Sequence, residues 1–248
     1  MFKTVIIILI AMVFVFTFKD SIEGFENRRI PKIIIQTWKD ENIPDKYKSC
    51  IESVKKFNSN YEYKFFTDRQ IEEFLQKHYP EYLNIYKRLP VKIQRIDFFR
   101  YIAVYHYGGF YLDLDMTVTK SFDSLLRYKC IFPIDQHIER KCKMKRYRKF
   151  CDAKMDFLIG QYAFGAVKGD KFLKKLIDGI IGNIEEYESY RDNGDRGIKF
   201  KRYVYDSTGP DYVTRVFMDN KNLVKILESG KDQYFGDYAV HNFFGTWK

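Results

Sequence analysis

Two aspartates, two positions apart, are the residues of this chain whose types and spacing most directly indicate chemistry. Asp113 and Asp115 stand in the run FYLDLD (110–115), which is typical of a β-strand. Alternation along a strand would place both side chains on one face, together with Tyr111. Two carboxylates about 7 Å apart on a strand repel each other unless a cation lies beside them. Oxygen ligands with open positions suit Mg²⁺ or Mn²⁺ completed by phosphate oxygens, so we expect a divalent ion that offsets charge on a diphosphate leaving group.

A second charged pair precedes this strand. Asp97 and Arg100 are three residues apart on an expected helix over 92–107, so they share one face of it. Gly108 and Gly109 end that helix with a sharp reversal, which lets its charged end approach the strand. A buried pair of this kind could hold sugar hydroxyls through bidentate hydrogen bonds. The alternative is an ordinary surface ion pair.

The Asp-x-Asp pattern alone is found in many unrelated proteins. DLDMT (113–117) also fits the DxDxT start of haloacid-dehalogenase-like phosphatases, in which the first Asp is the nucleophile. That hypothesis requires a downstream motif such as GDxxxD, and no acid follows Gly169-Asp170 at this spacing. No Ser/His/Asp or Cys/His nucleophile set is evident. The phosphatase is therefore the weaker alternative.

A longer string contains both charged pairs. The pattern D-x-x-R-Y-x-x-x-Y-x-x-G-G-x-Y-x-D-x-D resembles the signature of the DXD-containing family 32 glycosyltransferases, which include initiating α-mannosyltransferases and sphingolipid mannosyltransferases of yeast. The glucosylating domains of clostridial toxins carry a similar string. The specified positions are Asp97, Arg100, Tyr101, Tyr105, Gly108, Gly109, Tyr111, Asp113 and Asp115.

Three further segments are similar to elements of that family. IPKIIIQTWK (30–39) resembles its opening strand, STGPDYVTRVF (207–217) its TGP-x-x-x-T element, and HNFFGTW (241–247) its closing His…Ser/Thr-Trp motif. The resemblance therefore covers about residues 30–248. It implies a hexosyltransferase with a GT-A-type nucleotide-sugar-binding fold and retention at the anomeric carbon. The acceptor would be a glycan, lipid or protein, and the donor sugar stays open.

The resemblance also implies roles for particular residues. The metal ligands for Mn²⁺ or Mg²⁺ would be Asp115, Asp113 and His241. The donor-binding residues would be Thr37, Trp38, Asp97, Arg100, Tyr111, Asp113, Thr246 and Trp247, with the ring of Trp38 against the nucleotide base. The catalytic set would be Asp97, Arg100, Asp113 and Asp115. Catalysis would depend mainly on positioning and on stabilisation of the leaving group.

The elements that must position these residues can be read from periodicity. Strands are expected at 31–38, 61–66, 110–115 and 161–167, and helices at 45–58, from 67, from 80, at 92–107 and from 170 through 184. Thr67 with Gln70 forms a capping-box pattern, and Asp170 can cap the helix that follows it. Strand–helix alternation predicts an α/β fold with a mostly parallel central sheet.

The amino terminus differs from the rest of the chain. Thr4–Phe18 is an unbroken apolar run, shorter than the roughly 20 residues that a spanning helix needs, and no small-x-small cleavage site follows it. We expect an N-terminal hydrophobic helix at 1–18 that is an uncleaved signal anchor rather than a signal peptide. Residues 19–29 would form a tether and residues 30–248 the catalytic domain, in a Golgi-like or ER-like lumen. A buried N-terminal helix is the alternative.

Composition narrows the function classes. A hydrophobic content of 46% excludes a disordered chain, and a net charge of +10 predicts an anionic partner. Residues 140–149 (RKCKMKRYRK) would contact phosphate or a membrane, or form a solvated loop. This run and the many Tyr and Phe residues make a nucleic-acid-binding protein an alternative, but no recognised motif supports it and no nucleic acid is expected. An anchored glycan-binding pseudoenzyme is a third hypothesis. Cys142 and Cys151 could pair in an oxidising lumen or stay free thiols.

Overall fold

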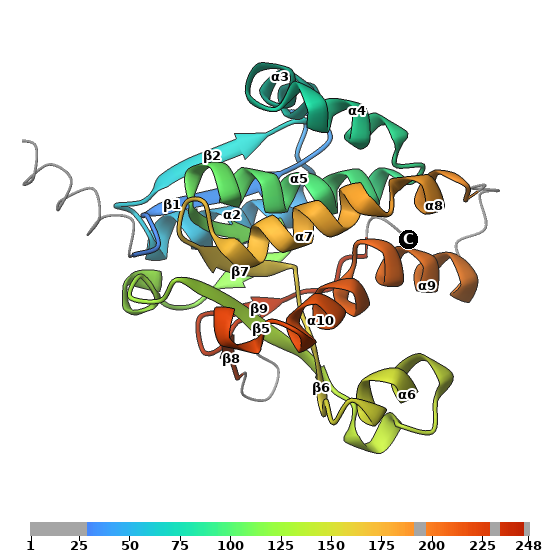
Figure 1. The fold of residues 1–248 in the computed structure, drawn as a ribbon. Helices are drawn as coiled ribbons and strands as arrows, with labels where there is room; N and C mark the ends of the chain where they lie inside the picture. Colours follow the sequence, from blue (N-terminus) through green and yellow to red (C-terminus); the bar gives the residue numbers. More distant parts are fainter. Residues whose placement is uncertain (1–28, 191–196, 229–233, 246–248) are drawn as a thin grey trace, which may run out of the picture.

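The computed structural model describes residues 29–190, 197–228 and 234–245, and its centre is a seven-stranded sheet (Figure 1). Its strands are β2 (Glu62–Phe66), β1 (Ile33–Thr37), β3 (Gly109–Leu112), β7 (Ala163–Ala166), β5 (Cys130–His137) and β6 (Phe157–Ile159) in spatial order, with β8 (Lys225–Leu227) also paired to β5. A separate two-stranded sheet joins β4 (Met116–Val118) to β9 (Ala239–His241).

Most strands of the large sheet run in one direction. β1 is parallel to both β2 and β3, and β5 is parallel to β8. β7 lies antiparallel between β3 and β5, and β6 is antiparallel to β5. Five strands therefore share one direction, and β6 and β7 oppose them. The predicted α/β class with a mostly parallel sheet is confirmed.

The helices cover both faces of this sheet. They are α2 (Lys48–Phe57), α3 (Asp68–His78), α4 (Pro80–Arg88), α5 (Lys92–Tyr107), α6 (Lys145–Asp152), α7 (Lys171–Gly182), α8 (Ile184–Glu188), α9 (Ile198–Ser207) and α10 (Pro210–Met218), with 3-10 turns η1 (Asp45–Tyr47), η2 (Phe122–Leu125), η3 (Glu139–Lys141) and η4 (Lys221–Leu223). The predicted capping box at Thr67 and the Asp170 cap are both present. The predicted helix from 170 ends at Gly182, and Ile184 begins α8 instead.

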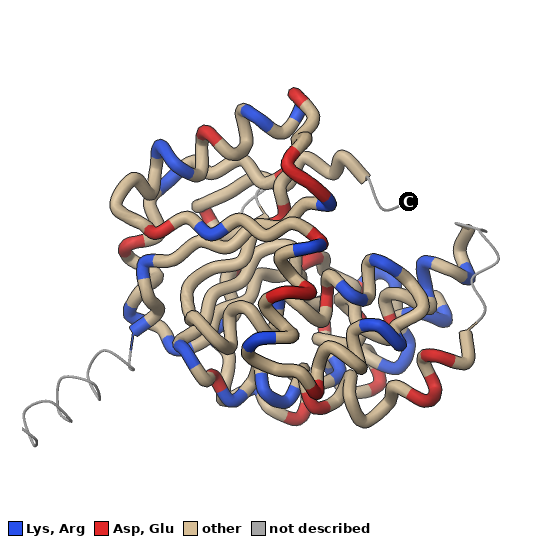
Figure 2. The backbone as a smooth tube through the Cα atoms, turned by 90° about the horizontal axis from the view of Figure 1, so that it is seen from above, with Lys and Arg blue, Asp and Glu red and all other residues tan. Residues whose placement is uncertain are grey.

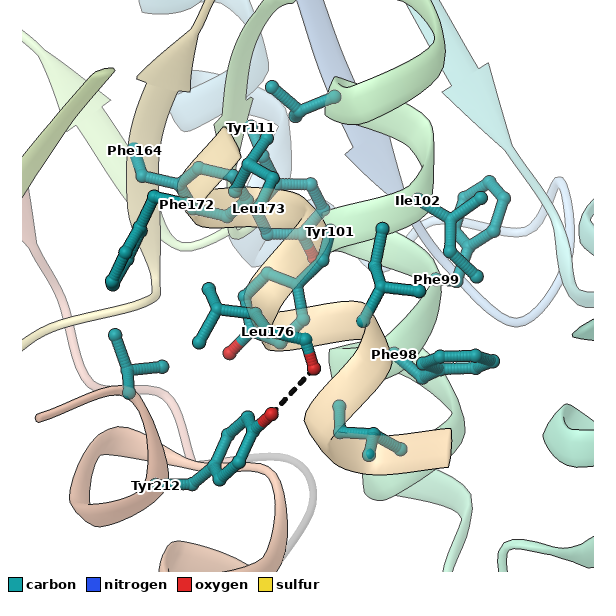
Figure 3. Packing of buried hydrophobic residues seen from close by; sticks show 14 of the residues in the cluster. Phe98, Phe99, Tyr101, Ile102, Tyr111, Phe164, Phe172, Leu173, Leu176 and Tyr212 are labelled. Carbon is teal, nitrogen blue, oxygen red and sulfur yellow. Dashed lines mark hydrogen bonds between the residues drawn. The ribbon is translucent and has the colours of Figure 1, made fainter. Parts of the chain in front are cut away.

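The two larger apolar clusters hold the layers together. Helices α5 and α7 lie side by side over one face, where Phe98, Tyr101 and Leu176 pack tightly (Figure 3). On β3 the side chains alternate as predicted, with Tyr111 in this cluster and Phe110 in the second cluster, which lies beneath α2 and β4. The central sheet is thus covered on both faces, as parallel sheets require.

The strand predicted at 110–115 is too long at its carboxyl end. β3 ends at Leu112. The Asp113 N–H donates to the Tyr162 carbonyl (2.7 Å), and the Met116 N–H donates to the Asp113 carbonyl (3.2 Å), which closes a turn before β4. Asp113 and Asp115 therefore lie in a turn rather than on one strand face. The cause is a distant partner, because β4 pairs with β9 from the end of the chain.

The reversal between α5 and β3 requires glycine. Gly108 and Gly109 have φ of +70° and +98°, a region that side chains rarely adopt. A Cβ on Gly109 would lie 2.4 Å from the Ile33 carbonyl oxygen. The missing side chain therefore lets β3 pack closely against β1.

Several predictions fall at the edges of the described ranges. The expected anchor 1–18, nearly all of the tether 19–29, and the donor-binding candidates Thr246 and Trp247 lie outside the described residues. Within the described ranges, no helix is long and apolar enough to cross a membrane. The basic run 140–149 includes parts of η3 and α6, so it is not simply a loop. Of the two alternatives for Cys142 and Cys151, the structure shows the disulfide.

Candidate functional site

A cavity of about 1100 Å³ opens at the carboxyl ends of β1, β3 and β5. This edge is where open α/β sheets commonly bind ligands. The predicted residues that line it are Thr37, Trp38, Asp97, Arg100, Tyr111, Asp113, Asp115 and His241. All of the predicted site residues that the structure describes are thus brought together.

Two carboxylates and an imidazole form the centre of this cavity. Asp113, Asp115 and His241 each offer one ligand atom, and these atoms all lie within 4.8 Å of one another. Pairing of Met116 with His241 across β4 and β9 brings the imidazole to the turn. Its Nε2 lies 3.2 Å from Asp115 Oδ1, and the Phe244 N–H donates to Asp115 Oδ2 (3.0 Å).

The two aspartates have different electrostatic surroundings. Burial raises the pKa of Asp113, and the charge of Arg100 offsets only part of this effect. Burial is the largest single effect on Asp115 and raises its pKa, but the hydrogen bond and charge of His241 and the backbone hydrogen bonds together outweigh it, so the pKa is lowered overall. His241 Nδ1 is buried without a hydrogen-bond partner among the described residues. Carboxylate and imidazole donors, one of them an orphaned buried nitrogen, suit Mn²⁺ or Mg²⁺, so these residues fit a divalent ion.

Arg100 connects α5 to this centre. Its Nη2 lies 3.2 Å from Asp97 Oδ1 and 3.4 Å from Asp113 Oδ1, and its Nη1 donates to the Gln161 carbonyl (3.0 Å). The guanidinium also lies over the ring of Tyr111. The side chains of Arg100 and Asp97 are 4% and 0% exposed, so the surface-pair alternative is wrong.

Asp97 lines the cavity, but its side chain is fully buried. Its Oδ2 accepts a hydrogen bond from Thr208 Oγ1 (2.7 Å), a residue of the segment 207–217. Burial raises the pKa of Asp97 to about 6, although Arg100 and Thr208 act in the opposite direction. The Tyr101 hydroxyl donates to the Thr208 carbonyl (3.1 Å) and to the side-chain oxygen of Gln161. Segments distant in the sequence therefore hold Asp97 in place.

The side of the cavity next to β1 contains hydroxyl and aromatic groups. The Tyr111 hydroxyl donates to Asp113 Oδ1 (3.0 Å) and lies 3.1 Å from Thr37 Oγ1. The rings of Trp38 and Tyr47 are 4.9 Å apart, and Trp38 Nε1 has no hydrogen-bond partner in the part of the chain that the structure describes. This arrangement offers a ring face and an unused donor to a ligand.

Sequence reasoning missed the opposite side of the cavity. Asp135, near the end of β5, lines it, and burial raises the pKa of this carboxyl to about 6 against the opposing charges of Arg146 and His241. Arg146 of α6 donates to both carboxylate oxygens of Asp211 on α10 (2.6 Å and 3.0 Å). The available signal was an acid at the end of the apolar run CIFPID (130–135).

Comparison with known proteins agrees with the resemblance drawn from the sequence. Residues 44–132 match the family described as "Glycosyltransferase sugar-binding region containing DXD motif". This match confirms the resemblance that the string 97–115 predicts. It favours neither the phosphatase nor the nucleic-acid alternative.

Curated relatives and a solved structure extend the comparison. The chain is 41% identical over 115 residues to inositol phosphoceramide mannosyltransferase 3 of Schizosaccharomyces pombe, covering 45% of this chain and 31% of that protein. It is 35% identical over 223 residues to mannosyl phosphorylinositol ceramide synthase CSH1 of Saccharomyces cerevisiae, covering 88% and 52%. The chain thus spans about a third to a half of these relatives. The ligand-free glycosyltransferase domain of the YGT toxin shares the fold, with TM-score 0.55, 10% identity and coverage of 81% and 80%.

Proposed function

We propose that this chain, whose residues 44–132 carry the DXD sugar-binding region of glycosyltransferases, is a metal-dependent glycosyltransferase with a GT-A-type fold. It would move a sugar from a nucleotide-sugar donor to a glycan, lipid or protein acceptor. The observation that carries the proposal is the meeting of Asp113, Asp115 and His241 with the buried Arg100 at one cavity. The names of the relatives make a mannosyl group the first donor sugar to test, and a phosphoinositol ceramide the first acceptor.

The donor would lie along the side of the cavity next to β1. The ring of Trp38 would stack on the nucleotide base. Thr37 and Tyr111 orient Asp113, which would contact the ribose or the sugar. Thr246 and Trp247 would reach the diphosphate.

Asp115, Asp113 and His241 would hold Mn²⁺ or Mg²⁺. A bound divalent ion offsets negative charge on a leaving diphosphate. The protein's own contribution is to pre-arrange these side chains through the pairing of β4 with β9 and through the buried Arg100. Side chains that are arranged in advance do not have to move during the reaction.

Transfer would retain configuration at the anomeric carbon. The acceptor hydroxyl oxygen would bond to that carbon on the face that the diphosphate leaves, and its proton would pass to the leaving phosphate. Arg100, fixed between Asp97 and Asp113, would orient the sugar. Asp135, on the far side of the cavity, would accept a hydrogen bond from the acceptor hydroxyl.

The catalytic domain would be luminal and held by the anchor 1–18. The disulfide between Cys142 and Cys151 supports this location, because such bonds persist in oxidising compartments. The basic surface, with a net charge of +10, agrees with an anionic donor.

A donor panel tests the proposal. The full chain would be incubated with Mn²⁺ and GDP-mannose, UDP-galactose, UDP-glucose or UDP-N-acetylglucosamine, and the released nucleoside diphosphate measured. We expect one donor to be turned over, and chelation of the metal to stop turnover. Asp115→Asn should abolish turnover while the unfolding temperature changes little, because its side chain is at the cavity rather than in the core.

Asp45→Asn is the matched control, since Asp45 is an exposed aspartate paired with Lys48. Normal turnover by a folded Asp115→Asn protein would contradict the metal assignment. Salt-sensitive RNA binding that survives loss of Asp113 and Asp115, without turnover of any donor, would favour the nucleic-acid hypothesis instead.

A further inference from the structure

The connection between β5 and β6 is much longer than their pairing requires. The two strands are antiparallel neighbours, and such strands can be joined by a few residues. Here residues 138–156, which we name the β5–β6 arm, intervene and contain η3 and α6. Figure 1 shows α6 extending away from the central sheet. Connections between paired antiparallel strands are usually far shorter.

The arm has a defined shape. The disulfide between Cys142 and Cys151 joins its two halves, and Tyr147 and Phe150 are the buried side chains of α6. Arg146 holds Asp211 on α10, and its guanidinium lies over the ring of Tyr205 on α9 (4.4 Å). The arm therefore presents one fixed outer face beside α9.

That outer face is strongly basic. Arg140, Lys143, Lys145 and Arg148 are exposed, and none forms an ion pair with another described residue. No acid interrupts the run 140–149. On the neighbouring α9, Lys199 and Arg202 are also exposed. Unpaired cations held together on a rigid arm create a local positive field that attracts an anionic surface.

Apolar side chains stand among these cations. Met144 is 55% exposed at the start of α6, and Ile198 is 80% exposed at the start of α9. A basic surface with exposed apolar side chains is the composition of segments that lie at a membrane interface.

We propose that the β5–β6 arm, together with the start of α9, docks on an anionic lipid bilayer. The arm's cations would contact lipid phosphates, and Met144 and Ile198 would enter the interfacial layer. Arg146 and Tyr205, from the same two helices, line the cavity, so docking would turn the cavity mouth toward the bilayer surface. The docking itself does not depend on the transferase proposal.

Lysine footprinting tests the docking. The full chain would be bound to vesicles of phosphatidylcholine alone, or of phosphatidylcholine mixed with phosphatidylinositol, and its lysines acylated with a water-soluble reagent. Because the apolar segment 4–18 can insert into both vesicles, only the lipid charge differs. We expect labelling of Lys143 and Lys145 to fall several-fold on the anionic vesicles, and high salt to restore it.

Lys77 is the internal control, because it is exposed on α3, which lies far from α6 in Figure 1. Equal labelling of Lys143 and Lys145 on both vesicles, or equal protection of Lys77, would overturn the proposal. Protection of these lysines by RNA but not by anionic vesicles would also overturn it.

A charge variant gives a second readout. Replacing Arg140, Lys143, Lys145 and Arg148 with Gln should lower the ratio of binding to anionic over neutral vesicles by roughly tenfold or more, since each cation near such a surface contributes to attraction. An unchanged ratio would contradict the docking. Donor turnover measured in detergent should be unaltered in this variant, so failure of the docking and failure of the transferase proposal are distinguishable.

Discussion

Arg100 lies between two of the carboxylates of the cavity. It is almost fully buried, and its guanidinium faces Asp97, Asp113 and the carbonyl of Gln161. Burial alone would lower its pKa, but the neighbouring carboxylates raise the pKa overall, so the charge persists. A planar fork can serve several acceptors at once, which a single ammonium cannot.

Arg100→Lys should therefore damage both stability and activity. We expect a loss of about 3 kcal/mol in the free energy of unfolding, because a single ammonium cannot replace the contacts of the buried guanidinium with Asp97, Asp113 and the Gln161 carbonyl. Donor turnover should fall about 100-fold. Chemical denaturation and released nucleoside diphosphate measure the two effects. Arg69→Lys is the control, because Arg69 forms an exposed pair with Glu73. Equal effects of the two substitutions would contradict the role of Arg100.

Asp135 allows the acceptor side of the cavity to be tested separately. It lines the cavity and has no hydrogen bond or ion pair among the described residues. Asp135→Asn should lower transfer to an acceptor by about 100-fold, because the amide binds the acceptor hydroxyl less well. Hydrolysis of the donor by water should change little. A parallel loss of both activities would place Asp135 on the donor side instead.

Helix α5 sets the geometry at the scale of elements. It carries Asp97 and Arg100 on one face and ends at Gly108, where the chain turns directly into β3. The carboxyl end of β3 then delivers Asp113 to the guanidinium. One helix–turn–strand unit therefore positions three of the charged groups of the site.

Gly109→Ala tests this unit. The added Cβ would meet the Ile33 carbonyl oxygen at 2.4 Å, and φ of +98° is strained for alanine. We expect a loss of about 3 kcal/mol or more in unfolding free energy, since backbone cannot move aside as a side chain can. Gly182→Ala, at the end of α7 where a Cβ meets nothing within 4 Å, should be neutral or slightly stabilising. Equal stability of both variants would contradict the close approach.

The end of α5 also makes stability depend on pH. Burial lowers the pKa of His106 to about 4, with repulsion from His78 as the next cause. As pH falls from about 6.5, the unfolded chain binds a proton before the folded chain does, so His106 makes unfolding easier between pH 6.5 and 4. His106→Gln should therefore lose less stability than the parent over this window. Parallel pH profiles of unfolding free energy would refute this prediction.

At the scale of the whole molecule, one sheet separates the two larger apolar clusters. Tyr111 and Phe110 are neighbours on β3 yet belong to different clusters. Figure 2 shows Lys and Arg interleaved with Asp and Glu along the outer helices, so the net charge of +10 is spread widely. The run 140–149 is an exception to this interleaving, because no Asp or Glu lies among its basic residues.

Because both clusters share the same strands, residues 30–248 should unfold as one unit. We expect far-UV circular dichroism and tryptophan fluorescence to give the same denaturant midpoint. Two separate transitions would indicate that the clusters are independent, and the single-domain prediction would then be wrong.

Local features were predictable from the sequence alone. The bounds of α5, the shared face of Asp97 and Arg100, and the alternation of β3 all depend on residues close in the chain. The string 97–115 indicated the resemblance to glycosyltransferases for the same reason. Helix periodicity, caps and glycine reversals are short-range effects, so a single sequence contains them.

Only the tertiary structure decided how the site is completed. His241 reaches Asp115 because β9 pairs with β4, and Thr208 reaches Asp97 because α9 ends against α5. The same pairing places Asp113 and Asp115 in a turn instead of on one face of a strand. Asp135 joins them because β5 ends at the same edge of the sheet. These contacts depend on hydrogen bonding and packing between distant segments, which no local pattern contains.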